Sequence, residues 1–126
     1  MYYSDFVRIS KTGIDLKTTG AVTIFTTENG TQRFVPTAII VEITAAVSIT
    51  VGATISAGIT AASYNDIMAA TVLTGVTAVN NMLAFPALAS AVVTSVPANT
   101  AFKINVTVAA TGTSQSARVD VIGYYV

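Results

Sequence analysis

Two stretches near the C-terminus alternate apolar and polar residues, and this alternation constrains the fold more than any other feature of the chain. The first is residues 102–108 and the second is residues 117–121, with the turn-forming residues 111–114 between them. A period of two belongs to a strand that buries one face. We therefore predict a two-stranded hairpin at the C-terminus, and an all-β fold whose last strand is part of a sheet.

The residue composition favours strands along the whole chain. The 126 residues include 17 Val, 12 Ile and 20 Thr, against 4 Leu. β-Branched side chains suit a pleated sheet and are less favoured in helices. A chain of this length is one domain, and it is long enough to bury a sizeable core.

Turn signals divide the remaining residues into short strands. Asn29-Gly30 is a strong hairpin signal, while Ser63 and Asp66 predict a helical turn over residues 63–68 with Ser63 as its N-cap. The predicted strands are residues 21–26, 32–35, 37–44, 47–51, 53–59 and 91–96, with two more within residues 71–90 around an Asn80-Asn81 turn. This spacing predicts a single-domain β-sandwich, specifically a jelly roll of about eight strands with one short helical turn.

Residues 37–44 are the most apolar of these segments. They follow Pro36, which we expect to end the preceding strand, and their nearly continuous apolar run predicts a central strand. Glu42 interrupts the run. A carboxylate inside a central strand needs a partner, but we favour the simpler interpretation that Glu42 faces solvent or the rim of the sheet.

The first 19 residues are treated as an N-terminal arm, and residues 20–126 as the sandwich domain. Aromatic residues and arginine are over-represented at the energetic centres of interfaces. The arm is therefore a candidate for gripping a partner, although an ordinary edge strand with a turn at residues 12–13 is an equal alternative. Neighbouring side chains on a strand point in opposite directions, so of the last two tyrosines one is expected to face the core and the other a partner. The interface candidates are Tyr2, Tyr3, Phe6, Arg8, Tyr124 and Tyr125.

Charge is distributed unevenly. Eight of the twelve charged residues lie in positions 1–42, and residues 43–102 contain a single one, Asp66. Either the surface is neutral and rich in Thr, Ser and Asn, or neighbouring subunits cover it; we favour the second, which predicts a homo-oligomer. The net charge of zero and the scattered Lys and Arg residues argue against nucleic acid as a partner.

A membrane location is not expected either. Residues 38–62 are largely apolar, but hydroxyl residues recur through them, and Gly52 and Gly58 interrupt them, unlike a spanning helix. The first ten residues lack the apolar region of a signal peptide, so we expect no cleaved signal.

The residues needed for common enzyme chemistries are missing. The chain has no His and no Cys, which removes Ser-His-Asp and Cys-His systems, thiolate metal sites and disulfides. The six carboxylates share no local motif, so neither a glycosidase pair nor a calcium site is indicated: Asp5, Asp15, Glu28, Glu42, Asp66 and Asp120. We predict a non-enzymatic protein without cofactor or metal.

A carbohydrate contact is a further hypothesis. Sugar sites use exposed aromatic rings with Asn and Asp, and Tyr64, Asn65 and Asp66 supply these groups on one predicted loop. The simpler interpretation is a capped turn whose ring packs on the core.

The C-terminal quarter of the chain resembles a known class of protein. Its Val96-Pro-Ala-Asn-Thr turn, its strand ending in Ala-Ala-Thr-Gly-Thr and its closing Val-Asp-Val-Ile-Gly-Tyr strand are similar to small β-sandwich virion proteins of tailed bacteriophages, among them jelly-roll capsid decoration (cement) proteins. The resemblance covers residues 96–126. It implies a homotrimeric jelly roll without catalytic residues, bound to the outside of the major capsid protein shell and assembled in the host cytoplasm. A tail or head-fibre subunit and a host-surface glycan-binding module are the alternatives.

Overall fold

The computed structural model describes residues 6–86 and 95–126, and in these ranges the chain forms eight strands and no helix. No helix of these two ranges is therefore long and apolar enough to cross a membrane. In chain order the strands are β1 (Val7–Asp15), β2 (Gly20–Thr26), β3 (Phe34–Val47), β4 (Thr54–Gly58), β5 (Met68–Val72), β6 (Met82–Pro86), β7 (Ala101–Val108) and β8 (Ser114–Tyr125).

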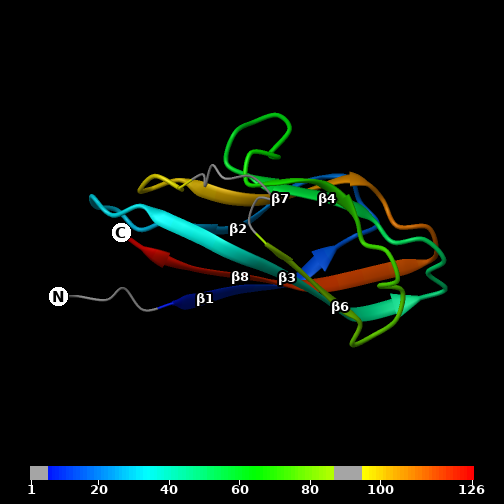
Figure 1. Cartoon of the computed structure of the whole chain (residues 1–126). Coiled ribbons are helices and arrows are strands. Elements are labelled where there is room, and N and C mark those ends of the chain that lie inside the picture. Colours follow the sequence, from blue (N-terminus) through cyan, green and yellow to red (C-terminus); the bar gives the residue numbers. More distant parts are fainter. Residues whose placement is uncertain (1–5, 87–94) are drawn as a thin grey trace.

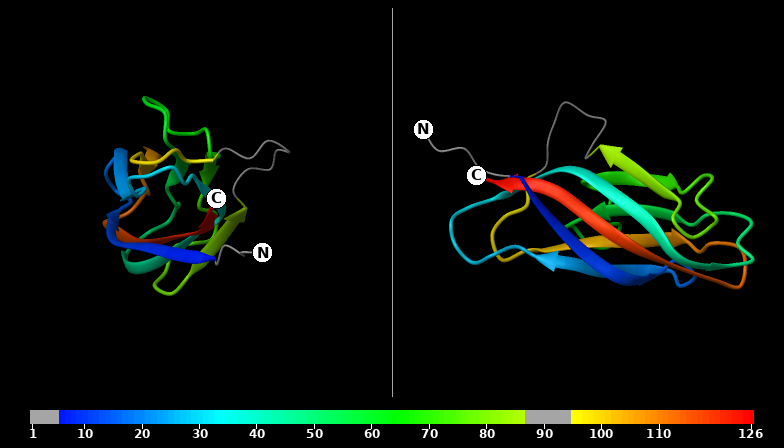
Figure 2. Two further views of the ribbon diagram at one scale, coloured as in Figure 1. Left: turned by 90° about the vertical axis from the view of Figure 1, so that its left-hand side faces the viewer. Right: turned by 90° about the horizontal axis from the view of Figure 1, so that it is seen from below.

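The strands form two four-stranded antiparallel sheets that pack face to face (Figure 1). One sheet has the order β1-β8-β3-β6 and the other has the order β2-β7-β4-β5. Among consecutive strands only β4 and β5 pair with each other; every other connection crosses from one sheet to the other. This order is the jelly-roll topology, and it confirms the predicted all-β sandwich. β1 starts and β8 ends at the same end of the sandwich (Figure 2).

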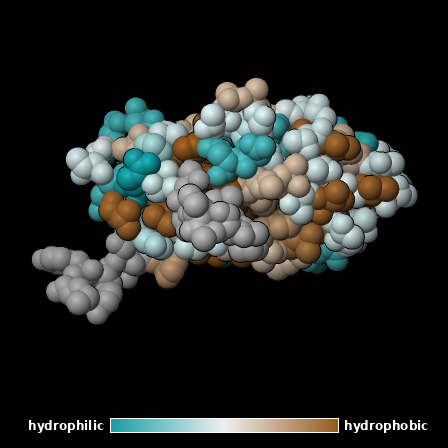
Figure 3. Space-filling model, turned by 45° about the horizontal axis from the view of Figure 1, so that its top comes forward, coloured by the Kyte–Doolittle hydropathy of each residue, from teal (hydrophilic) through white to brown (hydrophobic). Residues whose placement is uncertain are grey.

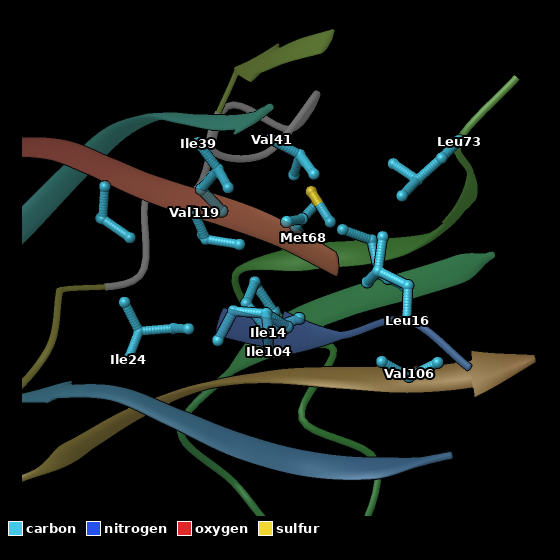
Figure 4. Close-up of a cluster of buried hydrophobic side chains, with 14 of the residues drawn as sticks. Ile14, Leu16, Ile24, Ile39, Val41, Met68, Leu73, Ile104, Val106 and Val119 are labelled. Carbon is cyan, nitrogen blue, oxygen red and sulfur yellow. The ribbon is translucent and has the colours of Figure 1, made fainter. Parts of the chain in front are cut away.

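The core lies between the sheets, where apolar side chains from both sheets pack together (Figure 4). The predicted inward residues of β7 and β8 are correct, except for Val108, which is 58% exposed. Phe102 stacks on Phe25, and Phe25 meets Phe34 edge to face, each with ring centroids 5.2 Å apart. The burial of these apolar side chains is the main source of stability. Fully buried members of the core include Leu16, Phe34, Ile39, Val41, Ile43, Ile55, Phe102, Ile104, Val119 and Val121.

The predicted C-terminal hairpin is wrong, although both of its strands exist. β7 pairs with β2 and β4, whereas β8 pairs with β1 and β3. Asn105 therefore lies beside Ala21 and Ser56, and not beside Asp120. Alternation identifies the buried face of a strand but not the strand that pairs with it, and here both strands turn their buried faces toward each other across the core.

The Asn29-Gly30 hairpin is wrong for the same reason. The loop over residues 27–33 carries the chain from β2 in one sheet to β3 in the other. Pro36 does not end a strand: β3 runs through it as a central strand, with a register shift against β8 between Pro36 and Ala38. Pro is tolerated at such an irregularity because the ladder of hydrogen bonds is already interrupted there.

Four further local predictions need correction or fall largely outside the described residues. Residues 63–68 form no helix. The turn at this place spans residues 60–64 and is closed by one hydrogen bond of 2.9 Å, which Tyr64 N donates to Thr60 O. Residues 47–51 are not a strand, because β3 ends at Val47 and Ser48 has a positive φ of 54°. The Asn80-Asn81 turn exists and precedes β6, but it joins strands of opposite sheets. Most of the predicted strand 91–96 lies outside the described residues, and Val96 forms a single bridge with Phe34.

Candidate interaction surfaces

The outer side of the sheet β1-β8-β3-β6 carries the most distinctive side chains of the molecule. Because paired residues in adjacent strands point to the same side of a sheet, the strand register places these side chains on one surface, which we call the Tyr124 face. Its members on β1, β8 and β3 are Arg8, Ser10, Val35, Ala38, Ile40, Glu42, Arg118, Asp120, Ile122 and Tyr124, and β6 adds Met82 and Ala84.

Four polar side chains form a chain of contacts across three strands of this face. The hydroxyl of Ser10 on β1 donates a hydrogen bond to Asp120 Oδ1 on β8. Arg118 Nε lies 3.4 Å from the same Asp120 oxygen, and Arg118 Nη2 donates to Glu42 Oε2 on β3 at 2.9 Å. The side chain of Asp120 is only 3% exposed, although it lies on an outer sheet face. A buried charge needs such partners, and the network ties β1, β8 and β3 into one register.

Glu42 therefore has a partner, contrary to the interpretation that we favoured from the sequence. Its side chain is 20% exposed and is ion-paired with Arg118. The network as a whole was not predicted, because its hydrogen bonds join residues that lie far apart in the sequence. Ser10 and Asp120 are 110 positions apart, and Glu42 and Arg118 are 76 positions apart. The signal available in the sequence was the position of Arg118 and Asp120 at alternate sites on the polar side of a strong strand.

An aromatic pair occupies the corner of the Tyr124 face where β1 begins and β8 ends. The rings of Phe6 and Tyr124 meet edge to face with centroids 5.5 Å apart, and Phe6 is 66% exposed. Arg8 lies next to them, paired with Ile122. Tyr125 points to the other side of β8, where its ring packs against Phe34 at 5.2 Å. The structure thus brings together three of the six interface candidates.

The structure describes only part of the expected N-terminal arm. Tyr2 and Tyr3 lie outside the described residues. Residues 7–15 form the edge strand β1, the alternative that the sequence left open, and β1 pairs with β8 from Val7 to Asp15. Ile14 and Leu16, at 1% and 0% exposure, belong to the core of the sandwich. The larger part of the expected arm therefore belongs to the sandwich.

A second apolar surface covers the end of the sandwich that is remote from this corner, which we call the loop end. Six of the eight exposed large apolar side chains in the described ranges lie on or near the loops at this end: Val47, Val51, Val72, Val79, Met82 and Val108. Hydrophobic residues are visible at the right-hand end of the molecule in Figure 3. Residues 43–58, 67–86 and 104–117, which supply all six, contain no charged side chain. The exposed apolar side chains of these uncharged segments are therefore gathered at one end of the fold.

The three candidates for a carbohydrate contact have different surroundings. Asp66 holds its own loop, because its carboxylate accepts hydrogen bonds from Ile59 N and from Thr60 Oγ1, each at 2.9 Å. Tyr64 is half-buried, with Lys103 Nζ 5.2 Å from the centre of its ring. Of the three, only Asn65 lines the neighbouring groove on the sheet.

The carboxylates do not converge on a site within the part of the chain that the structure describes. No three of Asp, Glu, His or Cys lie close enough together there to hold a metal ion. Asp15 is occupied in a turn, where hydrogen bonds from the Thr18 hydroxyl and from Lys17 N lower the pKa of its carboxyl below the usual 3.8. Glu42 and Asp120 belong to the network on the Tyr124 face, and Asp66 stabilises its loop.

Comparison with known proteins gives a likeness of fold. No protein-family model and no curated protein matches this chain. A chain in the solved structure "Capsid of Ralstonia phage GP4" has a TM-score of 0.63 and 12% sequence identity, covering 97% of this chain and 84% of that one. At this identity the likeness shows a shared fold alone. A chain in "Cyanophage Pam1 capsid asymmetric unit" has a TM-score of 0.49 and 23% identity, covering 97% of this chain and 83% of that one, and nothing further rests on it.

Proposed function

We propose that this chain is a structural protein of a phage particle, and specifically a capsid decoration protein that binds the outside of the major capsid protein shell. The observation that carries the proposal is the likeness of fold, over nearly all of this chain, to a chain from a phage capsid structure. The resemblance of residues 96–126 to phage β-sandwich virion proteins supports it independently of the structure. Asp15, Glu42 and Asp66 are used in turns and ion pairs, and this structural use agrees with a protein that acts by binding.

The Tyr124 face is the proposed contact with the shell. It offers an exposed aromatic ring, Phe6, beside Tyr124 and Arg8, which are the residue types that dominate binding energy at interfaces. The nearly buried Asp120 and its partners give this face a rigid polar centre. Tyr2 and Tyr3, which precede it in sequence, remain candidates for the same contact.

The loop end is the proposed contact between copies in a homotrimer. Its exposed valines lie in segments that contain no charged residue, so no charge within these segments opposes association. Exposed apolar surface of this kind marks interaction sites. Val72 on β5 and Val108 on β7 lie on either side of β4, each paired with Thr54. Their joint replacement by Glu is expected to give a monomer by light scattering, where the native chain gives a trimer. Val126→Glu is the matched control, because Val126 is equally exposed at the opposite end. A native monomer at micromolar concentration would contradict the trimer.

The location is tested on particles of the phage that encodes this chain. Immunogold labelling with an antibody against the recombinant protein is expected to decorate the outside of the head. Label confined to the tail or to fibres would support the alternative of a tail or head-fibre subunit, and unlabelled particles would contradict a virion role altogether. For the contact itself, the pair Phe6→Ala and Tyr124→Ala should weaken binding to shells prepared without the protein, while Thr107→Ala, exposed on the opposite sheet, should not.

A further inference from the structure

A groove crosses the outer face of the sheet β2-β7-β4-β5, on the opposite side of the sandwich from the Tyr124 face. It has a volume of about 500 Å³ and lies between the turn that joins β1 to β2 and the loop over residues 59–67. That loop rises above β4 at the top of Figure 1. The polar side chains that line the groove come from four separate segments: Thr19, Ser56, Ser63, Asn65, Asn105 and Thr107.

The loop wall of the groove is fixed to the sheet. Ser63 O accepts hydrogen bonds from Ser56 Oγ at 3.2 Å and from Asn105 Nδ2 at 3.1 Å. Asp66 holds the other side of the loop through Ile59 N and the hydroxyl of Thr60. Ser56 is fully buried under the loop, although it points away from the core. The wall is therefore formed before any ligand arrives, which lowers the entropic cost of binding.

Small residues keep the groove open. Gly20, Ala62 and Ala70 line it and offer no side chain long enough to fill it. Ala62 and Ala70 are both exposed, so the open space adjoins solvent. The volume falls within the range of about 300–1,000 Å³ that is typical of small-ligand sites.

The chemistry of the lining selects the ligand class. None of the lining residues is charged or aromatic. Phosphate, sulfate and carboxylate ligands are normally held by Arg or Lys, and apolar ligands by aromatic and aliphatic walls. Hydroxyl and carboxamide groups both donate and accept hydrogen bonds, as the hydroxyl groups of a sugar do, so this groove would hold a sugar by hydrogen bonds and without a stacked aromatic ring. From this lining we propose that the groove binds a neutral oligosaccharide.

The site differs from the carbohydrate contact that the sequence suggested. Of Tyr64, Asn65 and Asp66, only Asn65 is retained, and the other polar contacts come from strands far away in the sequence. The proposal does not depend on the capsid role, because the groove lies on the sheet opposite the proposed shell contact. The test therefore uses the isolated protein and no particle.

The test is an NMR titration of the native chain with neutral hexasaccharides of glucose and of N-acetylglucosamine, and with a sulfated heparin hexasaccharide. We expect at least one neutral sugar to shift the amides of Asn65, Asn105 and Thr107 saturably, and the sulfated sugar to leave them unchanged. Ala70→Trp fills the groove and should weaken binding by about tenfold or more. Ala69→Trp is the matched control, since Ala69 is equally exposed in β5 but does not line the groove.

Three results would overturn the proposal. These are no shift of the groove amides with any neutral sugar up to millimolar concentration, equal binding of the sulfated sugar, and equal loss of binding in the two tryptophan variants. A melting temperature for each variant shows that it is folded. Failure here would leave the immunogold result on the particle unaffected, so the two proposals fail separately.

Discussion

Replacing Gly123 by Ala tests the strand register of β8 against β3. Gly123 lies in β8 opposite Val7 and Pro36, at the register shift in β3. A Cβ atom at this position would collide with the carbonyl oxygen of Val35, and would lie 2.6 Å from Phe34 Cζ and 3.0 Å from Pro36 Cα. Its φ is not in the left-handed region, so this glycine is required by close approach and not by conformation.

The cost of the added methyl group follows from what surrounds it. Overpacking a core position costs about 1–3 kcal/mol, and the upper end applies where backbone atoms must move. Two of the three contacts here are backbone atoms of the central strand β3. Unfolding entropy of about 2.1 cal/mol/K per residue over 126 residues amounts to about 0.26 kcal/mol/K, so about 3 kcal/mol lowers Tm by about 11 °C.

The measurement is thermal and urea unfolding by circular dichroism at one fixed protein concentration. Gly75→Ala is the control, because nothing lies within 4 Å of its added Cβ and only its φ of +78° opposes the change. It should cost about 1 kcal/mol, the penalty for a left-handed residue. A Gly123→Ala protein within about 0.5 kcal/mol of the native chain would refute the register of β8 against β3.

Three other predictions concern the core, the loop and the effect of pH. Ile104→Val should lower the free energy of unfolding by about 0.5–1.5 kcal/mol, whereas Thr107→Ala on the same strand should stay within about 0.5 kcal/mol, because Ile104 is buried and Thr107 is exposed; equal losses in urea unfolding would contradict the orientation of β7. Asp66→Ala removes the acceptor of Ile59 N and should speed hydrogen exchange at that amide while the core amides keep their protection. Asp15 has a lowered pKa in the folded state, so its contribution to stability is present above pH 3.8 and is lost as the pH falls through the folded pKa; Asp15→Asn should remove this part of the acid dependence in a pH series of unfolding curves.

Much of the secondary structure could be predicted from local patterns. The residues of β2, β4, β7 and β8 were identified to within a few positions, because alternation and turn residues act within a few residues of one another. The same patterns identified Phe102, Ile104, Val106, Ala117, Val119 and Val121 as inward-facing. The predicted helical turn does not form, because Asp66 has a different role. Its carboxylate accepts hydrogen bonds from Ile59 N and from the hydroxyl of Thr60.

The candidate surfaces could be predicted from the sequence only in part. Phe6, Arg8 and Tyr124 were chosen by residue type, and their closeness follows from the pairing of the first strand with the last. The Ser10–Asp120–Arg118–Glu42 network and the groove both assemble side chains from distant segments. No local pattern encodes such contacts, because each depends on which strands become neighbours.

The sequence by itself determined that the chain is an all-β sandwich, where most of its strands lie, and that its middle is poor in charge. Only the tertiary structure decided that β7 and β8 lie in opposite sheets, that Glu42 has a partner, and that most exposed large apolar side chains of the described residues gather at the loop end. The physical reason is that burial imposes a period on each strand locally, whereas the choice of partner depends on closing two whole sheets over one core. Every strand pattern here is compatible with several partners, and only the packing of all eight strands selects one.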